Sequence, residues 1–201
     1  MLAKAEFTPD VLTRKVLCDT SAGYIERETH RNTSWQQARF EVCHHKWVDM
    51  SETDAGIALI NDSKYGVGLL ENSMSLSLLR ATVRPDVTSD RGHHEFSYMI
   101  YPHGDDFVGA EINNIAFEYN IPLSKAELNA ESIFDGLYMQ TMKMSEKGDM
   151  IVIRLSEQNG RRGRIRLDKK VKLLNLLEDI EGETDVLEYR PFEILTVGIE
   201  K

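Results

Sequence analysis

Three of the six histidines fall within one short stretch, SDRGHHEFSYMIYPHGDD, residues 89–106, where acidic side chains surround them. They are His93, His94 and His103. Histidine and carboxylate groups can bind a metal ion or transfer protons in acid–base catalysis. The same cluster could also form the rim of an active site whose reacting groups lie elsewhere.

A metal centre requires ligands that converge on one ion. If this stretch is extended, His93 and His94 point to opposite faces of the strand and cannot both reach one ion. The same argument applies to the adjacent pair His44 and His45. No spacing gives a positive sign of a metal site, so we interpret these histidines as polar loop residues.

An acid–base pair for sugar chemistry would join a histidine to a carboxylate across a cleft. Glu95 and His103 could supply such a pair, but many other pairs in the chain could do so equally well. The sequence therefore does not single out a catalytic pair.

A cationic run, RRGRIRLDKKVK, occupies residues 161–172 and contains seven lysines or arginines. Arg164 and Arg166 alternate there with Ile165 and Leu167, as on the solvent-facing side of a strand. The run contains no aromatic residue on which a base could stack. The whole chain has a net charge of -9, which disfavours nucleic acid and anionic membranes as partners.

The tryptophans and cysteines have simple interpretations. Trp35 and Trp47 are both assigned to the core, the usual place of tryptophan in β proteins, although exposed aromatics can also form sugar-stacking platforms. Cys18 and Cys43 lie 25 positions apart without a CxxC spacing. This pattern favours two free thiols and a cytoplasmic location. No apolar run is long enough to span a bilayer.

Alternating hydrophobicity predicts the elements that position these residues. Hydrophobic residues make up 41% of the chain and charged residues 28%, as in a globular protein. A period of two predicts half-buried antiparallel strands, and it appears in NSMSLSLLR, EFSYMIYP, DMIVIRLSE and FEILTVGIE. Turn sequences such as NDSKYG, EKGD and EQNGRRG separate these runs. The predicted fold class is all-β, with two sandwich-like sheets.

Helix signals are weak and lie in two places. SKAELNAESI, residues 124–133, opens with the possible cap Ser124. VKLLNLLEDI, residues 171–180, is compatible with a helix or with a strand buried on both faces. The strand pattern is interrupted around residues 120–134, which predicts one domain over 1–122 and a second over 123–201.

Taken in order, several stretches resemble the C-terminal β region of glycoside hydrolase family 38 α-mannosidases. They are GYIERETHRNTSWQQARFEVCHHKW, NDSKYG, LSLLR, PDVTSDRGHHEF, YPH, IRLSEQNG and RPFEILTVGIEK. The resemblance runs from about Val16 to Lys201. It implies part of a large, mutarotase-like β-supersandwich over residues 1–122 and a small C-terminal β-sandwich over residues 123–201.

The resemblance also implies that the catalytic groups lie in another domain. In this family an N-terminal α/β domain supplies an Asp nucleophile, a general acid and a divalent metal, usually zinc, for retaining hydrolysis of α-mannosidic bonds. This chain would then be a non-catalytic C-terminal part without a cofactor of its own. Its expected partners are the α-mannosidase catalytic domain and mannosides through the complete enzyme. Further copies of itself, in a homo-oligomer, are a third candidate partner.

One loop of the β region reaches the substrate cleft in some relatives and carries an Arg-Gly pair after an acidic residue. Asp90, Arg91 and Gly92 occupy the matching place, and with His94 they are the predicted substrate rim. An arginine there could donate hydrogen bonds to sugar hydroxyls or to a catalytic carboxylate. Two alternatives stay open: a stand-alone carbohydrate-binding module that uses Trp35 or Trp47, and a mutarotase-like epimerase.

Overall fold

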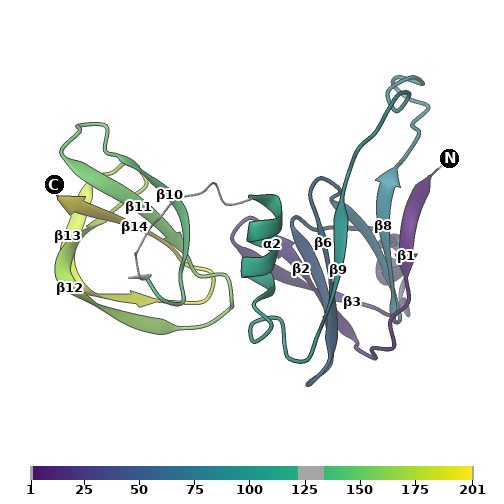
Figure 1. Ribbon diagram of the computed structural model, residues 1–201, viewed down its shortest axis with the longest axis horizontal. Helices are drawn as coiled ribbons and strands as arrows, with labels where there is room; N and C mark the ends of the chain where they lie inside the picture. The colour runs from purple at the N-terminus through teal and green to yellow at the C-terminus, as the bar shows by residue number, and fades with distance from the viewer. Residues whose placement is uncertain (1, 122–133, 201) are drawn as a thin grey trace. The chain divides into compact units, whose positions relative to one another are not determined.

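The computed structural model describes residues 2–121 and 134–200. The chain forms two compact units, Met1–Lys125 and Ala126–Lys201 (Figure 1). Within the described ranges, no helix combines the length and apolar character needed to cross a membrane. Each unit is built around antiparallel β-sheet.

The first unit contains two antiparallel sheets. One has the order β1-β8-β7-β4, with strands Ala3–Phe7, Ser73–Leu79, Gly66–Leu70 and Val42–Cys43. The other has the order β3-β2-β5-β6-β9, with strands Gly23–Glu28, Lys15–Thr20, Trp47–Ser51, Gly56–Asn61 and Tyr98–His103. The described part of the first unit also contains the helices α1 (Ser34–Ala38) and α2 (Ile112–Asn120).

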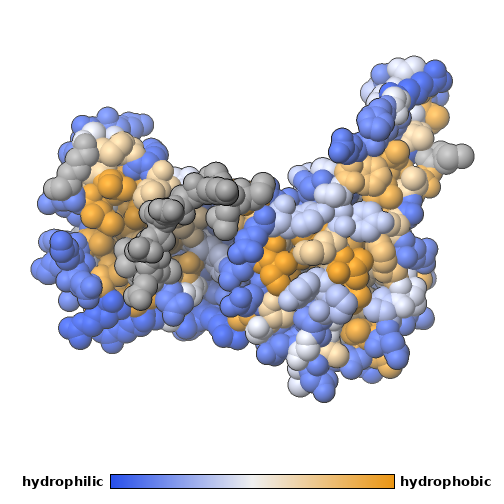
Figure 2. All heavy atoms as spheres, viewed as in Figure 1, coloured by the Kyte–Doolittle hydropathy of each residue, from blue (hydrophilic) through white to orange (hydrophobic). Residues whose placement is uncertain are grey.

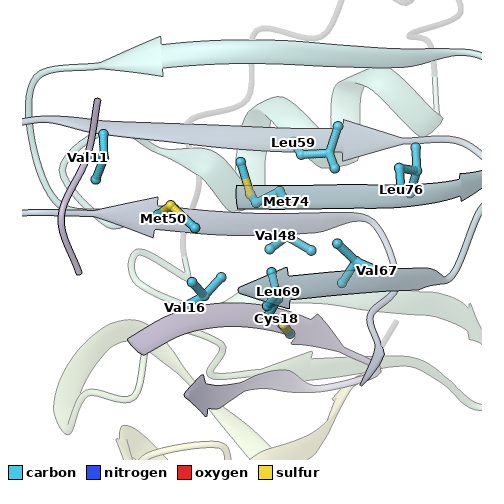
Figure 3. Packing of buried hydrophobic residues seen from close by; sticks show 10 residues of the cluster. All are labelled: Val11, Val16, Cys18, Val48, Met50, Leu59, Val67, Leu69, Met74 and Leu76. Carbon is cyan, nitrogen blue, oxygen red and sulfur yellow. The ribbon is translucent and has the colours of Figure 1, made fainter. Parts of the chain in front are cut away.

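A hydrophobic core lies between the two sheets of the first unit. In β8, Met74 and Leu76 are fully buried, whereas Ser73 and Ser75 are on the opposite face of the strand. Figure 3 shows side chains from both sheets meeting in this layer. The period of two in the sequence therefore corresponds to an inward apolar face and an outward polar face, as predicted.

The five-stranded sheet β3-β2-β5-β6-β9 has a second hydrophobic cluster on the face opposite the core between the two sheets. The helix α2 covers this cluster. Trp47, Ala58 and Ile60 of the sheet pack there with Phe107 and with apolar residues of the helix. The sequence reasoning missed α2. Its N-cap residue, Glu111, adopts a left-handed conformation without a side-chain cap, so the helix lacks a local start signal and depends on packing against the sheet.

The second unit has one five-stranded antiparallel sheet in the order β10-β11-β14-β12-β13. The strands are Tyr138–Met144, Met150–Ser156, Ile194–Glu200, Gly163–Leu174 and Ile180–Tyr189. The sheet curves around a core (Figure 1) to which β11, β12, β13 and β14 all contribute buried residues. The predicted apolar faces of DMIVIRLSE and FEILTVGIE are confirmed, because both face this core.

The cationic run behaves as predicted. In β12, Arg164 and Arg166 are exposed, whereas Ile165 and Leu167 pack against the core. Of the two possible helices, 124–133 lies outside the described residues. The other, 171–180, is not a helix: β12 continues through Leu174, and a turn then leads into β13. The fold class is confirmed as mostly β. The described residues form three antiparallel sheets, one more than the two expected from the sequence.

Candidate functional site

The connection between β8 and β9, residues 80–97, forms an arm that extends beyond the sheets of the first unit (teal in Figure 1). Hydrogen bonds within the arm shape it. Oδ1 of Asp86 accepts bonds from the backbone N and Oγ1 of Thr88, at 2.8 and 2.7 Å. These bonds lower the pKa of Asp86 below its usual value. The hydroxyls of Thr82 and Ser89 lie 2.6 Å apart.

The predicted rim residues all lie together on this arm. The backbone N of Arg91 donates to the Thr88 carbonyl at 3.0 Å, and Nε2 of His94 lies 3.0 Å from the Asp90 carbonyl oxygen. Gly92 has a φ of +133°, a conformation that L side chains rarely adopt. Arg91, Gly92 and His94 are exposed, while Asp90 is half-buried. The turn therefore presents the Arg91 side chain to its surroundings.

The base of the arm is tied to the body of the first unit. Oδ2 of Asp62, just after β6, accepts hydrogen bonds from the backbone N and the hydroxyl of Ser97, both at 2.9 Å. Tyr119 of α2 donates to the same hydroxyl at 2.6 Å. The Lys64 ammonium lies 4.8 Å from the Phe96 ring centroid. Figure 2 shows hydrophilic residues at the far end of the arm and apolar residues toward its base.

The interpretation of the histidines as polar loop residues is wrong for His103. Its side chain is 3% exposed, and Nε2 lies 2.8 Å from Oδ1 of Asp49 on β5. Its Nδ1 lies 2.8 Å from the Asp105 carbonyl oxygen. Burial raises the pKa of Asp49. The partner of His103 is therefore Asp49, not Glu95, and the pair is buried where a substrate has no access.

The same interpretation is wrong for His44, which is fully buried. Its Nε2 lies 3.0 Å from the amide nitrogen of Asn61. Its Nδ1 is buried without a hydrogen-bond partner among the described residues. Burial lowers the pKa of His44 to about 4, and the nearby His45 makes a smaller contribution in the same direction. The imidazole is consequently neutral at physiological pH, as a core group.

The two tryptophans have opposite environments. Trp47 is fully buried and donates from Nε1 to the Asn113 side chain at 2.8 Å. The core assignment is thus confirmed for Trp47. It is wrong for Trp35, which is 78% exposed on the short helix α1. The five residues of α1 bury none of their side chains, so no core contact was available to this tryptophan.

Metal ligands and cysteine thiols are the remaining residues that could carry chemistry. The part of the chain that the structure describes contains no cluster of three or more His, Cys, Asp or Glu that could hold a metal ion. Cys18 and Cys43 are both free thiols, as predicted. Burial raises the pKa of the Cys18 thiol to about 12, which makes this cysteine an unreactive core residue.

Sequence reasoning missed a cavity of about 280 Å³ beside α1, which arginines and glutamates line. The residues that line it come from several separate elements, so no short sequence motif could have predicted the cavity. One local signal was present. Thr33 and Gln36 form a capping box, and the Thr-x-x-Gln spacing is a recognised start of a helix. That signal would have located α1, although not the cavity beside it.

Two family models match the chain. Residues 1–88 match the glycosyl hydrolases family 38 C-terminal domain, and residues 136–197 match the family 38 C-terminal beta sandwich domain. The fold agrees with that of an α-mannosidase from Enterococcus faecalis, with a TM-score of 0.77 over 98% of this chain and 25% of that one. The sequences are 17% identical in that comparison, so it bears on the fold alone.

Curated relatives have much higher sequence identity. The chain is 39% identical to human alpha-mannosidase 2C1 over 170 residues, and 36% identical to alpha-mannosidase G of Dictyostelium discoideum over 201 residues. These alignments cover 78% and 87% of this chain but only 16% and 18% of the relatives. The chain belongs to glycoside hydrolase family 38 and corresponds to the C-terminal region of its α-mannosidases.

Proposed function

We propose that this chain supports the catalytic domain of an α-mannosidase and lines the rim of its carbohydrate site with the arm. The activity of the complete protein would be hydrolysis of α-mannosidic bonds. The observation that carries the proposal is the arm itself, since it extends from the sheets and its own hydrogen bonds hold Arg91 outward. The names of the relatives, all α-mannosidases, support the reaction class.

Arg91 would act by hydrogen bonding. Its planar guanidinium can donate two parallel bonds to sugar hydroxyls or to a carboxylate of the catalytic domain. Gly92 allows the tight turn after it, and the contact between His94 and the Asp90 carbonyl fixes the turn on the other side. The arm would thus position substrate without taking part in bond cleavage.

The zinc or other divalent metal implied by the family would be held by the catalytic domain. The described residues of this chain do not fit such a metal, because they offer no cluster of ligands. No step of the reaction is therefore assigned to this chain. This chain would contribute support for the catalytic domain and positioning of the substrate.

We also propose that the protein is cytoplasmic.

Two assays test the proposal. The isolated chain, supplied with an aryl α-mannoside and zinc, should show no saturable turnover. In an α-mannosidase that carries this chain, Arg91→Ala should lower kcat/KM by about tenfold or more, the cost of one lost charged hydrogen bond. Arg84→Ala removes another exposed arginine of the arm and should leave kcat/KM unchanged. Turnover by the isolated chain, or equal effects of the two substitutions, would contradict the proposal.

One observation favours a second candidate, a carbohydrate-binding module. Trp35 is exposed and could stack on a sugar ring, whereas Trp47 is buried and could not. Titration of the chain with mannosides, followed by tryptophan fluorescence, separates the two functions. Saturable binding that Trp35→Ala abolishes would favour the module. The absence of binding would leave the supporting role as the function of the chain.

A further inference from the structure

A polar cavity of about 280 Å³ opens at one side of the first unit, where the edge strand β3 approaches β4 and β7. Arg27 of β3 lies on its wall, together with Arg31 from the segment after β3 and Arg39 at the end of α1. Val42 and Leu69 supply an apolar side. This volume is at the lower end of the range for ligand pockets, about 300 to 1,000 Å³, and suits a small molecule or a single functional group.

Two arginines of the cavity have buried donors that find no acceptor in the described part of the chain. Nε of Arg27 and Nε of Arg31 are both buried, and neither has a hydrogen-bond partner among the described residues. Arg31 is held in place through its Nη2, which donates to the backbone carbonyls of Phe40 and Leu69 at 3.3 and 3.2 Å. A buried charged donor without a partner is destabilising, so an external acceptor would relieve both groups.

The two carboxylates of the cavity have partners other than the arginines. Glu26 forms an ion pair with Lys15. Oε2 of Glu28 accepts a hydrogen bond from Nε2 of Gln36 at 2.7 Å. Gln36 is itself fixed, since its Oε1 accepts bonds from the backbone N of Asn32 and of Thr33 at 2.7 and 3.0 Å. Oε2 of Glu28 could reach an arginine only by giving up its hydrogen bond to Gln36.

The local charge is opposite to that of the whole chain. Lys15 and the three arginines Arg27, Arg31 and Arg39 line the cavity with only two carboxylates, Glu26 and Glu28. The cavity therefore carries an excess of two positive charges, with histidine neutral, in a chain whose net charge is -9. Such a local excess attracts an anion rather than a neutral sugar.

From the two unpartnered guanidinium donors and the excess of positive charge, we propose that this cavity binds an oxyanion, a carboxylate or a phosphate group, between Arg27 and Arg31. Arginine suits this role because its planar fork matches the oxygen geometry of both groups. Arg39, on the exposed side, adds attraction from the mouth of the cavity. The oxyanion comes either from a free small anion or from another part of a longer α-mannosidase chain.

The donors themselves can be observed by NMR. The chain is titrated with inorganic phosphate, and separately with acetate, while the Nε–H resonances of its arginines are recorded. Sodium chloride at matched ionic strength serves as the reference. The resonances of Arg27 and Arg31 should shift saturably with the oxyanions and not with chloride. Absence of a saturable shift, or an equal shift in chloride, would overturn the proposal.

Substitutions assign the site. Arg27→Gln should raise the dissociation constant for phosphate by about tenfold or more, the factor that corresponds to one charged hydrogen bond. Arg27→Lys keeps the charge but removes the fork, and should weaken binding nearly as much. Arg162→Gln, at an exposed position of the second unit, changes the net charge equally and should have no effect. Equal effects of Arg162→Gln and Arg27→Gln would overturn the site.

Two further measurements complete the test. Phosphate should raise the thermal midpoint of the unsubstituted chain, because it binds the folded state, but not that of Arg27→Gln. The same titration on a longer α-mannosidase that carries this chain identifies the source of the oxyanion. Binding there indicates a free anion. Loss of binding there, with binding retained by the shorter chain, indicates a carboxylate from the preceding part of the protein.

Discussion

Nε2 of His103 lies 2.8 Å from Oδ1 of Asp49, although 54 positions separate the two residues in the chain. The other carboxylate oxygen of Asp49 accepts a hydrogen bond from the Ser51 hydroxyl. Nδ1 of His103 lies within hydrogen-bond distance of the Asp105 carbonyl. The pair thus connects β5, the end of β9 and the segment that leads to α2, and its side chains are almost completely buried.

His103→Ala should destabilise the first unit. The substitution leaves the buried Asp49 without its imidazole partner, and removal of one member of a buried pair costs about 3 kcal/mol or more. Urea unfolding followed by tryptophan fluorescence measures this cost for the first unit, because Trp35 and Trp47 both lie there. His94→Ala is the control, since His94 is exposed on the arm. A similar loss in both variants would contradict a structural role for the pair.

His44 should make the first unit sensitive to acid. Because its pKa falls from 6.5 to about 4 on folding, the unfolded state binds the extra proton between these values. The contribution of the neutral His44 to the free energy of unfolding is fully present above pH 6.5 and is lost as the pH falls toward 4. The total loss is about 3 kcal/mol.

Urea unfolding across that pH range compares the chain with His44→Gln, which cannot titrate there but keeps a side chain able to hydrogen-bond Asn61. The free energy of unfolding of the variant should depend less steeply on pH, while the other ionisable groups contribute equally to both proteins. Parallel pH profiles would show that His44 does not carry this dependence.

The two tryptophans should give separate fluorescence signals. In Trp47→Phe the remaining Trp35, which is 78% exposed, should emit at long wavelength and be strongly quenched by acrylamide. In Trp35→Phe the remaining Trp47 is fully buried and should emit at short wavelength with weak quenching. Trp35→Phe should change stability by less than about 0.5 kcal/mol, as expected for an exposed side chain. Similar quenching in the two variants would contradict these positions.

Open sheet edges should favour self-association. β1 and β4 end one sheet of the first unit, and β3 and β9 end the other. Unpaired edges can pair with another chain, and lysine at an edge opposes this. Sedimentation should therefore depend on concentration. Leu2→Lys, at a residue that is 45% exposed beside β1, should reduce association, whereas Leu177→Lys, 82% exposed in the second unit, should not. A monomer at every concentration would contradict the prediction.

The sequence by itself determined the class of fold and the family. Burial on a strand alternates with every residue, so runs such as NSMSLSLLR state locally which side chains face a core. The ordered stretches from GYIERE to RPFEIL carried the resemblance that the family models bear out. The resemblance also pointed to Asp90, Arg91, Gly92 and His94, and these residues share one loop that its own hydrogen bonds shape. Their place at a substrate rim stays a prediction.

Only the tertiary structure decided which individual side chains are buried. His103 is enclosed because Asp49, from a distant strand, meets it, and Trp35 is exposed because α1 packs none of its residues into a core. Likewise α2 depends on the sheet it covers, and the arginine cavity joins residues from several elements. Local patterns report the faces of single elements, whereas burial, ion pairing and cavities arise from contacts between elements far apart in the chain.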